Sequence, residues 1–119
     1  MKIGQVVEAR PSLQKLATQD LSIKTLYKIS KLLGKLDEEL VFYNEQRTKV
    51  LDKYCDIVGN QYVPREDDVA KLNAEMGELM DTDIEYEIKE VAIDINEDVK
   101  VSYNDLVALR GFVRIEGEE

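Results

Sequence analysis

The longest regular pattern of apolar positions in the chain runs from Leu26 to Ile57. Apart from position 47, which is an arginine, apolar side chains recur there at intervals of three and four residues, and these positions are Leu26, Ile29, Leu33, Leu36, Leu40, Tyr43, Val50, Tyr54 and Ile57. This spacing is typical of a long helix whose seam packs against other helices, as in a coiled coil. Ser22 is a suitable N-cap and Gly59 a suitable stop signal, so we expect a helix over about 22–58. Because such a helix cannot cover its own seam, partner helices must come from this molecule or a second copy.

Two shorter helices are expected to flank the long one. The first begins at Pro11, which suits an opening helical turn, and ends near residues 18–20. The second begins near Glu66 and repeats the three-four spacing up to Met80. We expect the second helix to fold back antiparallel on the later half of the long helix, and the first to cover the other half. Lys2–Val7 is interpreted as a short strand.

After Asp83 the apolar period changes to two, which is typical of half-buried strands. The alternation shifts by one residue midway, which predicts a bulge or turn, and its positions are Ile84, Tyr86, Ile88, Val91, Ile93 and Ile95. Ser102–Asp105 fits a capping box and predicts a short helix over Tyr103–Arg110. A last strand is expected at Phe112–Ile115.

These elements predict a single domain over residues 1–119 of the α+β class, mostly helical. The long helix packs antiparallel against shorter helices, and the C-terminal strands form a small antiparallel sheet. A chain of 119 residues, 44% hydrophobic and 34% charged, suits one folded domain. No apolar run reaches the roughly 20 residues that span a bilayer. The N-terminal residues resemble no signal peptide, so we expect a soluble cytoplasmic protein without a membrane partner.

The absence of several residue types narrows the chemistry. The chain has no histidine and one cysteine, Cys55, so the usual general base and a zinc ligand set are both missing. Neither of the usual glycine-rich nucleotide-binding motifs occurs. Cys55 has no histidine to activate it, and one cysteine forms no internal disulfide, in agreement with a reducing compartment. We therefore expect no enzyme, no cofactor and no metal site.

The charge is distributed unevenly. Residues 1–65 carry eleven basic and eight acidic side chains, whereas residues 66–119 carry five basic and seventeen acidic ones. A strongly acidic half argues against nucleic-acid binding, which needs clustered lysine and arginine. It agrees with a basic protein partner or with solubility alone.

The charged residues of the long helix leave two alternatives open. A lysine stripe with helical spacing is formed by Lys24, Lys28, Lys31 and Lys35. It is either a docking stripe for an acidic partner or nucleic acid, or a solvated face whose lysine stems cover apolar flanks, and we favour the solvated face. Arg47 lies on the apolar seam, where it could pair with Glu75 or Glu78 or set the register of a dimer.

A run of acids with a spacing of two residues is formed by Asp81, Asp83, Glu85 and Glu87. Carboxylates on one strand face could hold a hard cation such as calcium or magnesium. The run lacks the glycine and the distal glutamate of a calcium-binding EF-hand loop. We therefore favour a solvated strand face.

Four segments resemble one known family: LSIKTLYKISKLLGKLDEEL, a Tyr-Val-Pro segment, LNAEMGELMDTDIEYEI and VSYNDLVALRGFV. The chain is similar, over roughly residues 10–115, to small uncharacterised proteins of tailed phages and prophages of Gram-positive bacteria. The most telling pieces are Ile23–Ile29, residues 78–82 and Ser102–Leu109, which are structural signatures without a catalytic motif. The family is a domain of unknown function, so the resemblance implies a biological setting and no functional residues.

Taken with that setting, the seam predicts a protein that works by protein–protein contact through a helical-hairpin or coiled-coil surface. The expected partner is a phage or host protein, and a homodimer is an alternative. An alternative function, motivated by the acidic half, is an inhibitor that mimics nucleic acid and blocks a host defence or DNA-handling protein. The resemblance implies the host cytoplasm as the site of action, with association with the virion as an alternative.

Overall fold

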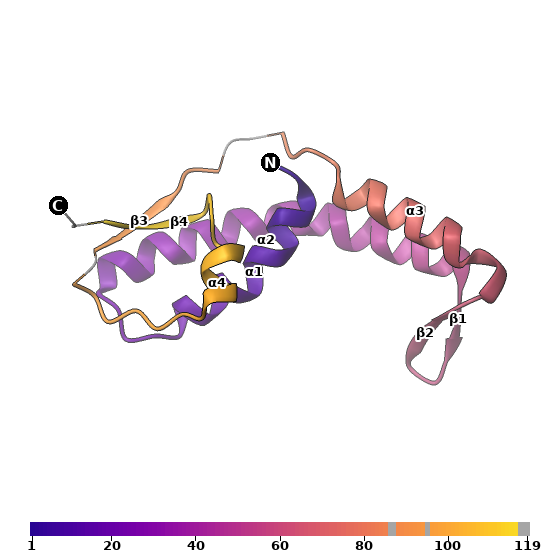
Figure 1. The fold of residues 1–119 in the computed structure, drawn as a ribbon, viewed down its shortest axis with the longest axis horizontal. Coiled ribbons are helices and arrows are strands. Elements are labelled where there is room, and N and C mark those ends of the chain that lie inside the picture. Colours follow the sequence, from indigo (N-terminus) through magenta and orange to yellow (C-terminus); the bar gives the residue numbers. More distant parts are fainter. Residues whose placement is uncertain (86–87, 95, 117–119) are drawn as a thin grey trace.

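The computed structural model describes residues 1–85, 88–94 and 96–116 (Figure 1). In chain order its elements are α1 (Ile3–Ala17), α2 (Ile23–Tyr54), β1 (Cys55–Val58), β2 (Gln61–Pro64), the 3₁₀ helix η1 (Glu66–Asp68), α3 (Val69–Met80), β3 (Val91–Asp94), α4 (Tyr103–Ala108) and β4 (Val113–Glu116). The molecule measures 55 × 31 × 22 Å, and α2 runs along most of its length (Figure 1). The predicted class, a mostly helical α+β fold around one long helix, is confirmed.

The seam of α2 is covered by two helices that pack antiparallel to it, as predicted. α1 lies along the first half of α2 and α3 along the second half (Figure 1). Near the start of α2 the core contains Leu13, Leu16, Ile29, Leu36 and Phe112. At the far end Val50 packs with Leu72 and Cys55. A small cluster of Ile3, Tyr43 and Leu79 joins the two regions, because the start of α1 meets the end of α3 there.

The long helix ends four residues earlier than the predicted boundary of about residue 58. α2 stops at Tyr54, and β1 pairs antiparallel with β2, Ile57 opposite Tyr62. Gly59 has a φ of +66°, a conformation that glycine adopts without strain and that hairpin turns require. The β-branched residues before it favour extended backbone. Ile57 is 67% exposed and therefore does not belong to the buried seam.

The expected N-terminal strand at Lys2–Val7 is wrong, because α1 already begins at Ile3. The helical period extends upstream of Pro11, and the buried apolar residues of α1 are Ile3, Val6, Ala9, Leu13 and Leu16. Packing of this face outweighs the hydrogen bond that Pro11 cannot donate inside the helix. Gln5 accepts the Lys2 backbone N–H at 2.7 Å and so closes the first turn.

The C-terminal strands pair in parallel, in contrast to the antiparallel sheet expected there. Val91 lies opposite Val113 and Ile93 opposite Ile115, whereas the antiparallel pair of the structure is β1–β2. Parallel strands need a crossover connection, and the loop and helix α4 between β3 and β4 supply it. The predicted capping box is confirmed, since Ser102 Oγ accepts the Asp105 N–H at 3.0 Å.

The first part of the predicted alternation forms no strand at residues 84, 85 and 88, which the structure describes, whereas the second part forms β3 and the expected last strand forms β4. Asp83 makes an isolated bridge with Lys2, and residues 88–90 have no regular structure. Ile84 instead packs against the small cluster at Tyr43. Tyr86, Glu87 and Ile95 lie outside the described residues, so the part of the alternation that they carry is not described.

Candidate functional site

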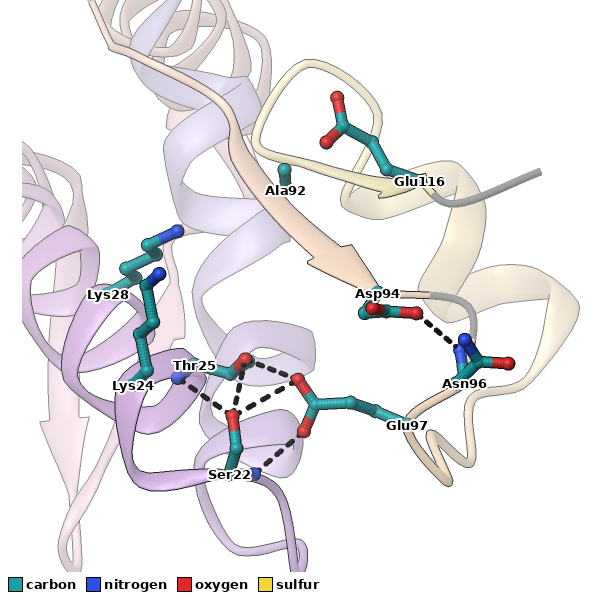
Figure 2. Close-up of a pocket in the computed structure, with 9 residues that line it drawn as sticks. All are labelled: Ser22, Lys24, Thr25, Lys28, Ala92, Asp94, Asn96, Glu97 and Glu116. Atoms are coloured by element: carbon teal, nitrogen blue, oxygen red, sulfur yellow. Dashed lines mark hydrogen bonds between the residues drawn. The ribbon is translucent and has the colours of Figure 1, made fainter. Parts of the chain in front are cut away.

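Two adjoining hollows lie between the first half of α2 and strand β3. The first, of about 540 Å³, is lined by residues that include Lys24, Lys28, Ala92, Asp94 and Glu97 (Figure 2). The second, of about 500 Å³, is lined by residues that include Tyr27, Lys28, Lys31, Lys35, Lys89 and Ala92. Lys28 and Ala92 line both hollows, and we call the two together the α2–β3 groove.

One end of the groove is held by Glu97, which follows β3. Its carboxylate accepts the Ser22 backbone N–H at 2.7 Å and the hydroxyl groups of Ser22 and Thr25 (Figure 2). The Ser22 N–H is the main cause that lowers the pKa of Glu97, and the Thr25 hydroxyl adds to it. Ser22 Oγ accepts the Thr25 N–H at 3.2 Å, so the predicted N-cap is confirmed. The segment after β3 is thereby tied to the first turn of α2.

The second hollow combines cationic walls with apolar surface. Lys31 Nζ lies 5.4 Å from the centre of the Tyr27 ring, a cation–π distance, and the Tyr27 side chain is 61% exposed. The carboxylate of Glu90, which also lines this hollow, lies 3.3 Å from Arg114 on β4. Arg114 also donates to Glu116 at 2.7 Å, so it offsets only part of the Glu90 charge, but the lysines of this hollow outnumber its one acid.

Strand β3 directs backbone groups toward the groove. The Val91 N–H donates to the Phe112 carbonyl at 2.8 Å, on the β4 side of the strand. Because successive residues of a strand direct their N–H and C=O groups to opposite edges, those of Ala92 face away from β4. Within the described ranges this sheet has two strands, so β3 is an edge strand. Ala92 lines both hollows, so this edge belongs to the groove.

The structure brings the four lysines of the stripe into one groove with β3. Lys24 and Lys28 line the first hollow, and Lys28, Lys31 and Lys35 line the second. Sequence reasoning missed Lys89 and the edge of β3. The only signal in the sequence was the apolar alternation after Lys89, which locates a strand but does not indicate the helix beside it.

Arg47 lies outside this groove and outside the buried seam. Its side chain is exposed, whereas the seam of α2 continues through Tyr43 and Val50. Glu75, one of the two acids expected to pair with it, instead accepts from Lys53 at 3.0 Å and from the Tyr54 hydroxyl. The Tyr54 hydroxyl is the main cause that lowers the pKa of Glu75.

The described residues of the acidic run lie outside the α2–β3 groove and do not line it with the lysine stripe. Asp81 and Asp83 lie 3.8 Å and 3.3 Å from Lys2 Nζ, and Glu85 is exposed. Glu87 lies outside the described residues. Among the side chains that the structure describes, no three cysteines, aspartates or glutamates form a group that could hold a metal ion.

Over the described part of the chain, no helix has both the length and the apolar character needed to cross a bilayer. No protein-family model, curated protein or solved structure matches the chain.

Proposed function

We propose that the chain is a non-enzymatic protein-binding module of a phage or prophage. It acts in the host cytoplasm or on the virion, and it contacts a phage or host protein through the α2–β3 groove. The observation that carries the proposal is the concentration of lysines in one groove of a chain whose net charge is −9. Opposite charges across an interface speed encounter and select the partner.

The composition of the groove favours a protein partner over nucleic acid. The first hollow contains Asp94, Glu97 and Glu116 in addition to its lysines, and these acids would repel a phosphate backbone. The second hollow adds apolar surface from Tyr27 and Val91, which a protein side chain can cover. Mixed charge with apolar surface is the composition of a protein interface.

The acidic alternative, mimicry of nucleic acid, has less support. A mimic needs carboxylates that are available to a basic partner, and Lys2 already lies beside Asp81 and Asp83. These pairs are exposed and weak, but they reduce the local negative charge.

Site-specific photo-crosslinking in host cells that produce the protein tests this function. We expect p-benzoylphenylalanine at Lys28 to give a discrete protein adduct, and the same substitution at the exposed Lys71 of α3 to give none. An adduct of twice the mass of the chain identifies a second copy as the partner and also supports the proposal. Nucleic acid in the adduct, or no adduct at residue 28, would overturn it.

A further inference from the structure

Resting on the proposed function, we infer how the partner binds: an acidic, extended segment of the partner protein adds as a third strand to the open edge of β3. It lies over the second hollow of the α2–β3 groove, between this edge and the lysines of that hollow, because the acids of the first hollow would repel it as they would a phosphate backbone. The partner's backbone pairs with β3, and its carboxylates face the lysines. This is strand addition to an exposed sheet edge, in which backbone hydrogen bonds supply affinity and side chains supply specificity.

The first argument is the backbone edge. The N–H and C=O of Ala92 face away from β4, because the Val91 N–H is directed to Phe112 on the other side. Val91 and Ile93 are buried in the core, so β3 is held rigidly from beneath. The next outward-facing residue, Asp94, accepts the Glu97 N–H at its carbonyl at 3.0 Å, so among the described residues this edge offers the N–H and C=O of Ala92 and the N–H of Asp94. A rigid edge with such groups is a template for another strand.

The second argument is the alignment of α2 with β3. Residues 27–35 of α2 share one hollow with residues 89–92, and residues 22–28 share the other with Ala92, Asp94, Asn96 and Glu97. The strand and the helix therefore run alongside each other in opposite directions. The lysines recur every three or four residues, which is about 4.5–6 Å along a helix axis. Alternate side chains of an extended strand are about 6.6–6.8 Å apart, so successive carboxylates on one strand face can follow successive lysines.

The third argument is charge and apolar contact. Lys28, Lys31 and Lys89 line the second hollow, and its acid Glu90 is offset in part by Arg114, which Glu116 shares. A segment with acidic residues on one face of its strand would present their carboxylates to the lysines, and the methylene groups of the same side chains to Tyr27 in the same hollow. The chemistry selects an acidic protein strand, and a basic or neutral strand lacks the charge match.

The test uses the full chain and a fluorescein-labelled peptide of alternating Glu and Val, with binding followed by fluorescence anisotropy. The comparison probes are a peptide of alternating Lys and Val, the Glu–Val peptide with every second amide N-methylated, and a single-stranded oligonucleotide. The protein variants are Ala92→Pro and the pair Lys28→Glu with Lys31→Glu. The matched control, with the same change of net charge, is Lys49→Glu with Lys71→Glu, at exposed sites outside the groove.

We expect the Glu–Val peptide to bind, with affinity that falls as salt is added. The Lys28/Lys31 pair should weaken binding about tenfold or more, and the control pair much less, since only the first places like charges opposite the peptide. Ala92→Pro removes one N–H from the open edge and should weaken binding about fivefold, because a typical hydrogen bond has that effect. Proline is tolerated on an edge strand, and retention of the far-UV circular dichroism spectrum checks the fold. If that variant does not fold, the N-methylated peptide provides the same test from the partner's side.

Three outcomes would overturn the inference. One is no binding of the Glu–Val peptide, and another is stronger binding of the oligonucleotide. The third is binding that N-methylation and Ala92→Pro leave unchanged. The third outcome, together with a protein adduct at residue 28, would reject strand addition and keep the proposed function. Absence of any protein adduct at residue 28 would reject the proposed function itself.

Discussion

The Ser12 hydroxyl donates a 2.7 Å hydrogen bond to Oδ1 of Asp105, from α1 to α4 and across 93 positions of sequence. Both side chains are buried. The same carboxylate lies 3.3 Å from Lys15 Nζ and accepts the Ser102 backbone N–H at 3.3 Å. These contacts lower the pKa of Asp105 from 3.8 to about 2, with the Ser12 hydroxyl as the largest cause. The Asp105 carboxylate therefore caps the first turn of α4 and links α4 to α1.

This link predicts a specific loss of stability in acid. Because the pKa of Asp105 is lowered in the folded state, its ionised form stabilises folding above about pH 4, and this contribution disappears as the pH falls to about 2. We expect Asp105→Asn to reduce the slope of unfolding free energy against pH in that window, measured by urea unfolding. The exposed Asp20→Asn is the matched control and should leave the slope close to that of the unchanged protein. Equal slopes for Asp105→Asn and the unchanged protein would contradict the prediction.

The two roles of Asp105 illustrate which features the sequence could predict. Its capping box with Ser102 was predictable, because both residues lie within one helical turn and the motif is local. The hydrogen bond between Asp105 and Ser12 was not predictable, because no sequence pattern relates a serine inside an amphipathic helix to a residue far along the chain. The lysine stripe was also predictable only in its local part. Its spacing along α2 was evident from the sequence, but its position beside β3 depends on a crossover between parallel strands.

The seam of α2 was predicted correctly only in part, because its burial also depends on residues distant in the sequence. The heptad positions Ile29, Leu36, Tyr43 and Val50 are buried as expected. Leu33, by contrast, is only partly buried, whereas Leu32, which lay outside the predicted seam, is buried. Periodicity finds the centre of a buried face, but the flank that becomes covered depends on where the neighbouring elements pack. Sequence alone does not contain the position of α1 and β3 around α2.

Two glycines in helices should respond in opposite ways to substitution by alanine. A Cβ at Gly34 meets nothing within 4 Å, so Gly34→Ala should stabilise the protein by about 0.5–1 kcal/mol through helix propensity. A Cβ at Gly4 would lie 3.0 Å from the Met80 carbonyl oxygen, where α1 meets α3. Gly4→Ala should therefore destabilise the protein by about 1–3 kcal/mol. Urea unfolding of the two variants checks both signs, and a loss of stability with Gly34→Ala would indicate a close contact there.

The different burial of Leu36 and Leu33, on adjacent turns of α2, predicts that their substitution by alanine lowers the unfolding free energy by different amounts. Leu36 is fully buried in the main core, so Leu36→Ala should cost about 2–5 kcal/mol in unfolding free energy. Leu33 packs against the same core while partly exposed, and Leu33→Ala should cost clearly less. The two variants remove the same atoms from the same helix, so the difference isolates burial. Equal losses in urea unfolding would mean that something else covers Leu33 in solution.

The two ends of the molecule should also open independently, and Cys55 reports on one of them. This single cysteine is buried beside Val50 and Leu72, at the end of α2 farthest from Leu13. Leu72→Ala should speed labelling of Cys55 by a thiol reagent about tenfold or more, because it loosens only the packing of that end. Leu13→Ala removes a fully buried side chain from the other end and should have a much smaller effect on the rate. If the chain instead opens as one cooperative unit, both variants will accelerate labelling in proportion to their loss of global stability.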